Sequence, residues 1–259
     1  MTPSVADHLP DAGETACFGY QRVKAADKGL LVGRHFSSVA ARYDLMNTLL
    51  SFGLHHLWKR AAVKMMGLKP GNRVLDVCGG TADLALLAAR VVGGRGRVLV
   101  YDINRAMLDA GRPKVARSHL AGRILYLQGD AEHLSLPDNS FDGAMVGFGI
   151  RNLTHPDAGF REMHRVLKPG GRLMCLEFSQ PTWAWFRWLY DAYSFYFMPL
   201  AGKIMAGDRR AYRYLPESIR MFSQPRALAA LLTDTGFSGV RFRRLTNGIA
   251  AVHVGIKNR

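Results

Sequence analysis

The sequence predicts an α/β protein built on a doubly wound, mostly parallel sheet. Segments typical of strands and of helices alternate between residues 73 and 178, and this alternation is the pattern of parallel sheets joined by helical crossovers. A glycine-rich turn, Cys78-Gly79-Gly80-Thr81, follows the first of these strands. Near the C-terminal end, Asn247-Gly248 separates two β-rich runs, which predicts an antiparallel hairpin that closes the sheet.

Length and composition agree with a globular protein. A chain of 259 residues can form one α/β domain with appendages. An apolar content of 48% and a charged content of 21% exclude wholesale disorder. The net charge of +15 favours anionic surroundings: membrane headgroups, nucleic acid or an acidic ligand.

Cysteine spacing and hydropathy bound the setting of the protein. Cys17, Cys78 and Cys175 are scattered and show no zinc-binding spacing, so we expect reduced cysteines and no metal site. Residues 1–20 do not resemble a signal peptide. The most apolar stretch, residues 183–205, is interrupted by charged residues and proline, so we expect a cytoplasmic protein without a transmembrane span.

The N-terminal part is expected to be separate from the sheet. Residues 1–28 have no clear periodicity, and we expect a mobile arm there, with a partner-binding arm as the alternative. Residues 29–70 are expected to form a helical lid. From Phe36 onward, apolar residues recur on one helical face that also carries Tyr43 and Asn47. Either this helix packs on the core with two satisfied polar groups, or it covers a site and turns these groups toward it.

A second lid helix is predicted over residues 54–66. It carries His55, and an isolated histidine of this kind is usually structural or exposed. The sheet domain is then expected to span residues 71–259. Its predicted strands are residues 73–77, 97–101, 123–128, 142–147, 172–178, 239–245 and 249–256. Its predicted helices are residues 82–92, 105–118, 157–167 and 225–235, and Lys168-Pro169-Gly170-Gly171 is a predicted sharp turn.

Residues 181–222 interrupt the alternation with a dense group of aromatic residues. Nine aromatic side chains fall between Trp183 and Phe197, which predicts an inserted helical cap. Such a cap could line an apolar substrate tunnel, pack on the sheet or rest on a membrane face, and ordinary core packing remains an alternative.

The glycine turn and the acidic residue Asp102 predict a nucleotide site. An acid at the end of the second strand can accept hydrogen bonds from a ribose. A dinucleotide would place its pyrophosphate at the N-terminus of the following helix, where Asp83 puts negative charge. A cationic sulfonium tolerates nearby acids, and Asp130 after the third strand could accept from an adenine amine. These residues therefore favour S-adenosylmethionine over a dinucleotide.

Several segments carry a specific resemblance. From about Phe18 to its C-terminus, the chain resembles the ubiquinone/menaquinone biosynthesis C-methyltransferases. The most specific matches are Tyr43-Asp44-Leu45-Met46-Asn47, Phe148-Gly149-Ile150-Arg151-Asn152 and Tyr212-Arg213-Tyr214-Leu215-Pro216-Glu217-Ser218-Ile219.

This resemblance implies a class I methyltransferase fold that binds S-adenosylmethionine and methylates a ring carbon of a polyprenylated quinol. The residues expected to contact the cofactor by position are Thr81, Asp102, Asp130 and Ala131. The other expected cofactor residues are Asp76, Gly79, Gly80, Ile103 and Gly147. Asp130 stands where Asn is common in the family, and Gly147 stands where some members have a cofactor-contacting Ser.

Carbon methylation needs an electron-rich ring, so the expected substrate is the reduced quinol. We expect Arg151 and Asn152 to face its oxygens, with Arg151 stabilising the developing phenolate. Tyr43 and Asn47 would complete a hydrogen-bonded net around a proton acceptor, and His55 is a second candidate base.

The partners implied are the quinol, with its tail in a membrane that the protein contacts peripherally, and a second copy of the chain in a homodimer. No nucleic-acid-binding module is visible. The alternatives are another small-molecule or RNA methyltransferase, or a non-catalytic cofactor-binding scaffold.

Overall fold

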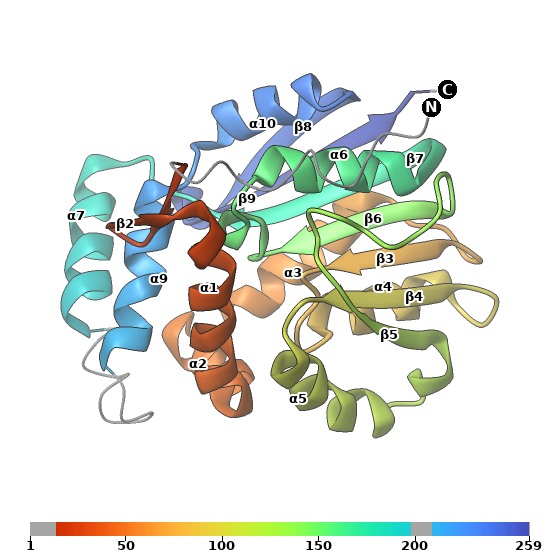
Figure 1. The fold of residues 1–259 in the computed structure, drawn as a ribbon, viewed down its shortest axis with the longest axis horizontal. Coiled ribbons are helices and arrows are strands. Elements are labelled where there is room, and N and C mark those ends of the chain that lie inside the picture. Colours follow the sequence, from red (N-terminus) through yellow and green to blue (C-terminus); the bar gives the residue numbers. More distant parts are fainter. Residues whose placement is uncertain (1–13, 198–208, 259) are drawn as a thin grey trace.

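The computed structural model describes residues 14–197 and 209–258, and its centre is a seven-stranded sheet (Figure 1). The strand order is β5-β4-β3-β6-β7-β9-β8. The strands are β3 (Arg73–Val77), β4 (Arg97–Asp102), β5 (Ile124–Gln128), β6 (Phe141–Gly147), β7 (Leu167–Phe178), β8 (Phe237–Leu245) and β9 (Ala250–Lys257). Strands β3 to β7 pair in parallel, and β9 is antiparallel to both β7 and β8. The predicted fold class and the C-terminal hairpin are confirmed.

The topology fixes where a ligand can bind. Strand β3 pairs with β4 on one side and with β6 on the other, so the strand order reverses at β3. In open parallel sheets, ligands bind at such a reversal, outside the carboxyl ends of the strands. The turns after β3 and β6 therefore flank the expected binding crevice.

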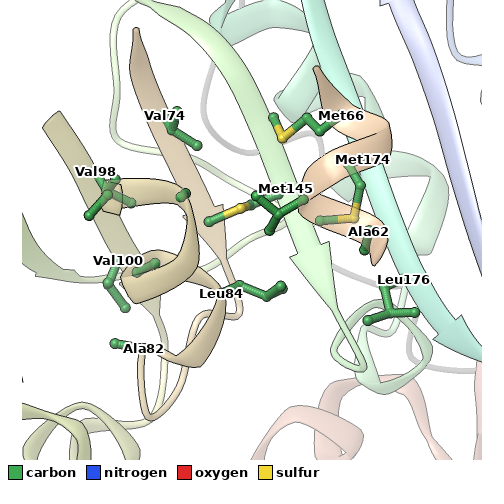
Figure 2. Packing of buried hydrophobic residues seen from close by; sticks show 14 of the residues in the cluster. Ala62, Met66, Val74, Ala82, Leu84, Val98, Val100, Met145, Met174 and Leu176 are labelled. Carbon is green, nitrogen blue, oxygen red and sulfur yellow. The ribbon is translucent and has the colours of Figure 1, made fainter. Parts of the chain in front are cut away.

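Helices cover both faces of the sheet, because alternate residues of a strand point to opposite faces. The helices of the sheet domain, with α3 before it, are α3 (Leu54–Met66), α4 (Asp83–Val92), α5 (Arg105–Ala116), α6 (Pro156–Val166) and α10 (Pro225–Asp234). Val74 packs in the cluster that includes α3, α4 and α5, whereas Leu75 packs in the cluster of α6 and α10. In part of the first cluster, Met66 and Leu84 lie with Met145 of β6 (Figure 2). The core therefore consists of two hydrophobic clusters, one on each face of the sheet.

The sharp turn predicted at residues 168–171 is part of β7. Leu167 pairs with Phe141, and the next pair is Arg172 with Gly143. The intervening residues form an irregularity within the strand, where Gly170 has a φ of +78°. The sharp turn predicted between the helix and the following strand is therefore an irregularity within β7, because this glycine pair permits a bulge.

The mobile arm expected at residues 1–28 is wrong for the residues that the structure describes there. Residues Thr15–Phe18 (β1) and Gln21–Lys24 (β2) pair as an antiparallel hairpin, and helix α1 begins at Ala25. The ring of Phe18 stacks on that of Tyr214 with centroids 4.5 Å apart. Residues 1–13 lie outside the described part of the chain.

The lid and the cap meet at one end of the sheet (Figure 1). The helix expected from Phe36 is divided into α1 (Ala25–Val39), a short 3-10 turn (Ala40–Arg42) and α2 (Tyr43–Leu50). The described cap consists of α7 (Ala184–Ala192), a π-helical segment (Tyr193–Phe197) and α9 (Arg209–Met221). Residues 198–208 of the predicted cap lie outside the description. Within the described residues, no helix is long and apolar enough to cross a bilayer.

Candidate active site

A cavity of about 460 Å³ opens where β3, β4 and β6 end. We call it the turn cavity because the glycine turn after β3 forms one wall. All nine residues expected from the sequence to contact a cofactor line it: Asp76, Gly79, Gly80, Thr81, Asp102, Ile103, Asp130, Ala131 and Gly147. The opposite wall comes from α1, including Gly29 and Gly33. The structure therefore brings together residues that are more than 70 positions apart in the chain.

The turn itself is a strained and closely packed backbone segment. A Cβ atom on Gly79 would lie 2.8 Å from Cγ1 of Val100 and 2.9 Å from the carbonyl oxygen of Asp76. Cys78 and Ala82 have φ angles of +53° and +65°, a region that non-glycine residues rarely adopt. Such strain is concentrated at functional sites, where the surrounding packing maintains it.

Asp102 is held in place by the turn. Its Oδ2 accepts a hydrogen bond from the backbone N–H of Gly80 at 2.9 Å, and its Oδ1 accepts from that of Asn104 at 2.8 Å. Burial raises the pKa of Asp102 to about 6. Each carboxylate oxygen can accept more than one hydrogen bond, so this fixed group can still bind two neighbouring hydroxyls of a ligand.

Asp76 is the least satisfied polar residue of this cavity. Its side chain is buried, and neither carboxylate oxygen makes a well-formed hydrogen bond with the described residues; the backbone of Ala85 only partly offsets the effect of burial on its pKa. Burial raises its pKa to about 8. An unpartnered buried carboxylate is costly, and a cationic ligand group would relieve that cost.

The charge of Asp83 is compensated, which corrects the argument made from the sequence. Its Oδ2 lies 2.6 Å from Nζ of Lys59, and its Oδ1 pairs with Lys114. Burial alone would raise the pKa of Asp83, but the two lysines outweigh burial and hold it well below its usual range. Asp83 therefore does not present free negative charge to a pyrophosphate, and its presence does not by itself exclude a dinucleotide.

A second cavity, of about 420 Å³, lies beside the first. We call it the aromatic cavity. Its walls come from α1, α2, α3, the cap and the ends of β6 and β7, and they include Phe36, Trp58, Phe148, Phe178, Phe186, Tyr190, Tyr193 and Tyr214. Phe36, Tyr43, Lys59 and Phe148 line both cavities. The two cavities therefore share a wall.

Four of the five expected catalytic residues line the aromatic cavity: Tyr43, Asn47, His55 and Arg151. The fifth, Asn152, lines the turn cavity instead, and its Oδ1 accepts a hydrogen bond from the hydroxyl of Tyr214 at 2.9 Å. We expected Arg151 and Asn152 to face one ring together, but the structure has Arg151 in the wall of the aromatic cavity and Asn152 in that of the turn cavity. Adjacent residues in the 3-10 turn Ile150–Asn152 point to different cavities.

Tyr43 and Asn47 are joined by a side-chain hydrogen bond, and burial raises the pKa of Tyr43. Of the two interpretations of their helix, the structure agrees with the one in which it covers a cavity. The hydroxyl of Tyr193 also faces inward and donates to the carbonyl of Leu50 at 2.7 Å.

Arg151 is one half of a buried ion pair. Its Nη1 lies 2.9 Å from Oε1 of Glu177, with side-chain exposures of 4% and 1%. The same guanidinium donates to the carbonyl oxygen of Phe148 and lies over the ring of Phe178, 5.3 Å from its centroid. Burial raises the pKa of Glu177, although the charge of Arg151 opposes this. The positive charge of Arg151 is therefore shared with Glu177.

Sequence reasoning missed three residues that shape the site. The only sequence signal for Glu177 was a charged residue within an apolar strand. The signal for Lys59 was its position four residues after His55, on the same face of the predicted helix. Gly111 of α5 allows the helix to approach the turn, because a Cβ there would lie 2.8 Å from the carbonyl carbon of Thr81. A glycine inside an amphipathic helix was the available signal.

We find no candidate metal site within residues 14–197 and 209–258. No group of three or more His, Cys, Asp and Glu side chains in these ranges is arranged to hold an ion.

Comparison with known proteins identifies close relatives. A model of the ubiE/COQ5 methyltransferase family matches residues 22–257. The chain is 51% identical over 255 residues to the ubiquinone/menaquinone biosynthesis C-methyltransferase UbiE of Pseudomonas entomophila, covering 98% of each chain. It is 52% identical over 246 residues to the UbiE protein of Pseudomonas putida strain W619, covering 95% of this chain and 96% of the relative.

Solved structures with the same fold are more distant in sequence. The [4+2]-cyclase SpnF superposes with a TM-score of 0.66 at 18% identity, covering 89% of this chain and 97% of that chain. A SAM-dependent methyltransferase from Aquifex aeolicus superposes with a TM-score of 0.57 at 20% identity, covering 76% and 88%. These likenesses concern the fold alone.

Proposed function

The chain belongs to the ubiE/COQ5 methyltransferase family, and from this premise we propose that its two adjoining cavities hold the two reactants of a carbon methylation. It is a C-methyltransferase of ubiquinone and menaquinone biosynthesis. The turn cavity would bind S-adenosylmethionine, and the aromatic cavity would bind the ring of a polyprenylated quinol. The observation that carries this assignment is the shared wall, because methyl transfer needs the two reactants in direct contact.

The residues of the turn cavity fit S-adenosylmethionine. Asp102 would accept hydrogen bonds from the ribose hydroxyls, and Asp130 would accept from the adenine amine. The buried and unpartnered carboxylate of Asp76 would face the cationic amino-acid part of the cofactor. The absence of a side chain at Gly79 lets the turn pack closely against Val100 and Asp76.

The residues of the aromatic cavity fit a reduced ring. The bound cofactor supplies an electrophilic methyl group on a cationic sulfur. A phenol with a pKa near 10 is only about 0.1% ionised at pH 7, so the chain must assist the loss of the hydroxyl proton. Tyr43 and Asn47 lie on the lid helix, with Tyr43 in the wall shared by both cavities. We place the proton acceptor, a water or hydroxyl, against this pair.

The ring carbon ortho to the phenolate oxygen would take the methyl group, and the electrons of the carbon–sulfur bond would remain on sulfur, which would leave as S-adenosylhomocysteine. The ring would regain aromaticity when the proton on that carbon passes to water. Arg151 shares its charge with Glu177, so its contribution to the developing phenolate is smaller than that of a free guanidinium. We assign it chiefly to holding the carbonyl of Phe148 and the loop after β6.

The prenyl tail gives a reason for membrane contact. Each methylene is worth about 0.8 kcal/mol when buried, so a long tail remains in the bilayer while the ring enters the protein. Helix α7 exposes Trp185 and Trp188, and Trp183 just before the helix is also exposed. Leu189 of the same helix and Phe52 are also exposed and line the aromatic cavity. We propose that this surface, which we call the tryptophan face, rests on the membrane with the cavity open toward the lipid.

Methyl transfer from labelled S-adenosylmethionine tests the proposed function. Demethylmenaquinol and the 2-polyprenyl-6-methoxy-1,4-benzoquinol are assayed side by side under reducing conditions. We expect label in the ring of at least one quinol and none in the matching quinones. Cofactor binding without transfer to either quinol would overturn the proposal and favour a non-catalytic scaffold.

A further inference from the structure

Each of the two cavities contains one buried acceptor group that the described protein leaves without a partner. In the turn cavity it is the carboxylate of Asp76. In the aromatic cavity it is Nδ1 of His55, whose side chain is 3% exposed. Because a buried acceptor without a partner is costly, its presence in a binding cavity indicates which ligand group belongs there.

The hydrogen bonds of Thr48 favour one tautomer of His55. The Thr48 hydroxyl donates its only proton to the backbone carbonyl of Asp44 at 2.9 Å. The same oxygen lies 3.1 Å from Nε2 of His55 and 3.4 Å from Nε2 of His56, and with its proton on Asp44 it accepts from both rings. Nε2 therefore carries the proton, and Nδ1 is left with a free lone pair.

The ring also remains neutral at physiological pH. Burial, followed by the charges of Lys59 and His56, lowers the pKa of His55 to about 4. Nδ1 is therefore an acceptor and does not become a donor. The same low basicity makes His55 a poor proton acceptor for a phenol with a pKa near 10, which argues against its use as the general base.

The other polar groups of the aromatic cavity already have partners. The hydroxyl of Tyr193 donates to Leu50 and that of Tyr214 to Asn152, while the indole N–H of Trp58 donates to Oγ1 of Thr246 at 2.8 Å. Among the described residues of this cavity, no other buried side-chain atom lacks a partner.

We propose that Nδ1 of His55 accepts a hydrogen bond from a ring hydroxyl of the quinol and thereby selects the reduced ring over the quinone. A quinol offers O–H donors at its two oxygens, whereas the quinone has carbonyl oxygens that can only accept. A quinone carbonyl oxygen at this position would face Nδ1 with its lone pairs, so the two acceptors would repel each other and neither would have a hydrogen bond. His55 is thus a specificity-determining residue of the aromatic cavity, and this inference rests on the proposed function.

The test compares binding of a short-chain 1,4-naphthoquinol with binding of the matching 1,4-naphthoquinone. The affinities are measured by anaerobic calorimetry on the full chain with S-adenosylhomocysteine present. We expect the wild-type protein to bind the quinol at least about 10-fold more tightly than the quinone. In the quinol complex Nδ1 accepts a hydrogen bond, whereas in the quinone complex the same buried acceptor stays unpaired. His55→Gln keeps a polar group at the position of Nε2 but none at Nδ1, and it should reduce this preference to less than about 2-fold.

Two matched variants provide the controls. His55→Asn keeps an acceptor at the position of Nδ1 and should retain most of the preference. His119→Leu changes an exposed histidine that lines neither cavity and should leave the preference unchanged. Equal preference in His55→Gln and wild type, or no preference in the wild type, overturns the inference.

A direct measurement does not depend on any variant. In wild-type protein labelled with ¹⁵N at histidine, the Nδ1 resonance of His55 should move upfield when the quinol is added and not when the quinone is added. An Nδ1 chemical shift that does not change when the quinol is added overturns the inference. If the wild-type protein methylates the quinol in the same preparation, that failure leaves the proposed function standing; if it neither binds nor methylates the quinol, the proposed function fails first.

Discussion

The hydroxyl of Thr81 donates a hydrogen bond to Oδ1 of Asp44 across 2.6 Å, and this contact joins the cofactor turn to the lid helix α2. Lys114 of α5 binds the other carboxylate oxygen of Asp44 at 2.7 Å. Since α2 also carries Tyr43 and Asn47, the turn that would hold the cofactor and the helix that would meet the quinol are linked directly.

This link predicts that the two ligands bind cooperatively. In the wild-type protein, S-adenosylhomocysteine should tighten binding of the quinol several-fold, within the usual range of coupling between sites. Asp44→Ala should reduce that factor toward one. Calorimetric titration of the quinol with and without S-adenosylhomocysteine measures it. Asp109→Ala, which removes an exposed acid paired with Arg105 and Arg112, is the control. A coupling factor unchanged by Asp44→Ala contradicts the prediction.

Asp76 predicts a conflict between stability and cofactor binding. Its pKa is raised from 3.8 to about 8 in the folded protein. The free energy of unfolding that depends on this group is therefore highest below about pH 4, where the carboxyl is protonated in both states, and it is lost as pH rises through about 8. In the cofactor-free protein at pH 8, Asp76→Asn should therefore raise the free energy of unfolding by about 1–3 kcal/mol. Urea unfolding at pH 5 and pH 8 measures this, and a variant no more stable than wild type at pH 8 would refute it.

The same residue predicts how cofactor affinity depends on pH. The ammonium group of the ligand favours the ionised carboxylate, so binding must release a proton from Asp76 below pH 8. The affinity for S-adenosylhomocysteine should consequently fall by up to about 10-fold for each pH unit between pH 7.5 and pH 6. Asp76→Asn should bind weakly with a flatter pH profile. A wild-type affinity that is constant over this range rules out the assignment.

Gly111 predicts a substitution whose effect has the opposite sign to that expected for a helix. Replacing a helical glycine by alanine ordinarily stabilises a protein by about 0.5–1 kcal/mol. Gly111→Ala should instead cost about 1–3 kcal/mol, because the new Cβ would lie 2.8 to 2.9 Å from backbone atoms of Thr81. Gly29→Ala in α1, where nothing lies within 4 Å of the added carbon, is the matched control. Thermal unfolding gives the change in melting temperature for each variant. Equal changes in Gly111→Ala and Gly29→Ala would contradict the close packing at Gly111.

The buried pair of Arg151 and Glu177 predicts strongly non-additive substitutions. Arg151→Met and Glu177→Gln should each reduce the free energy of unfolding by about 3–5 kcal/mol, because each leaves one buried charge unpaired. The double variant should lose less than the sum of the two. Urea unfolding of the four proteins gives the coupling energy, and additive losses would show that the pair does not act as a unit.

The tryptophan face predicts specific sensitivity of membrane binding. Trp185→Ser/Trp188→Ser should weaken flotation with vesicles that contain anionic lipid by about 10-fold or more, because two exposed indoles no longer enter the interface. Leu125→Ser removes a comparably exposed apolar side chain on β5 and should not change flotation. Absence of wild-type binding at low salt would exclude this surface as a membrane contact.

Much of the fold could be predicted because its signals are local. The alternation of strands and helices, the glycine turn and the Asn-Gly hairpin each depend on neighbouring residues, and the observed boundaries of β3, α3 and α4 lie within one residue of those expected. The N-terminal hairpin was missed because β1 and β2 are each four residues long; both strands pack on α1, and β1 also packs on α9. The bulge at residues 168–171 was missed because a glycine pair is typical both of a turn before a strand and of an irregular strand.

The sequence by itself determined the sheet, the turn and the acidic residues around it, since the pattern that builds each strand also fixes what lies at its carboxyl end. Only the tertiary structure decided which charges are free. Asp83 and Arg151 both carry charge in the sequence, yet one is neutralised by Lys59 and Lys114 and the other by Glu177. Asp76 and His55 show the reverse case, because folding buries both and leaves the Asp76 carboxylate and Nδ1 of His55 without a well-formed hydrogen bond among the described residues. The reason is physical: hydrophobic periodicity acts over a few residues, whereas burial and charge pairing depend on contacts between distant segments.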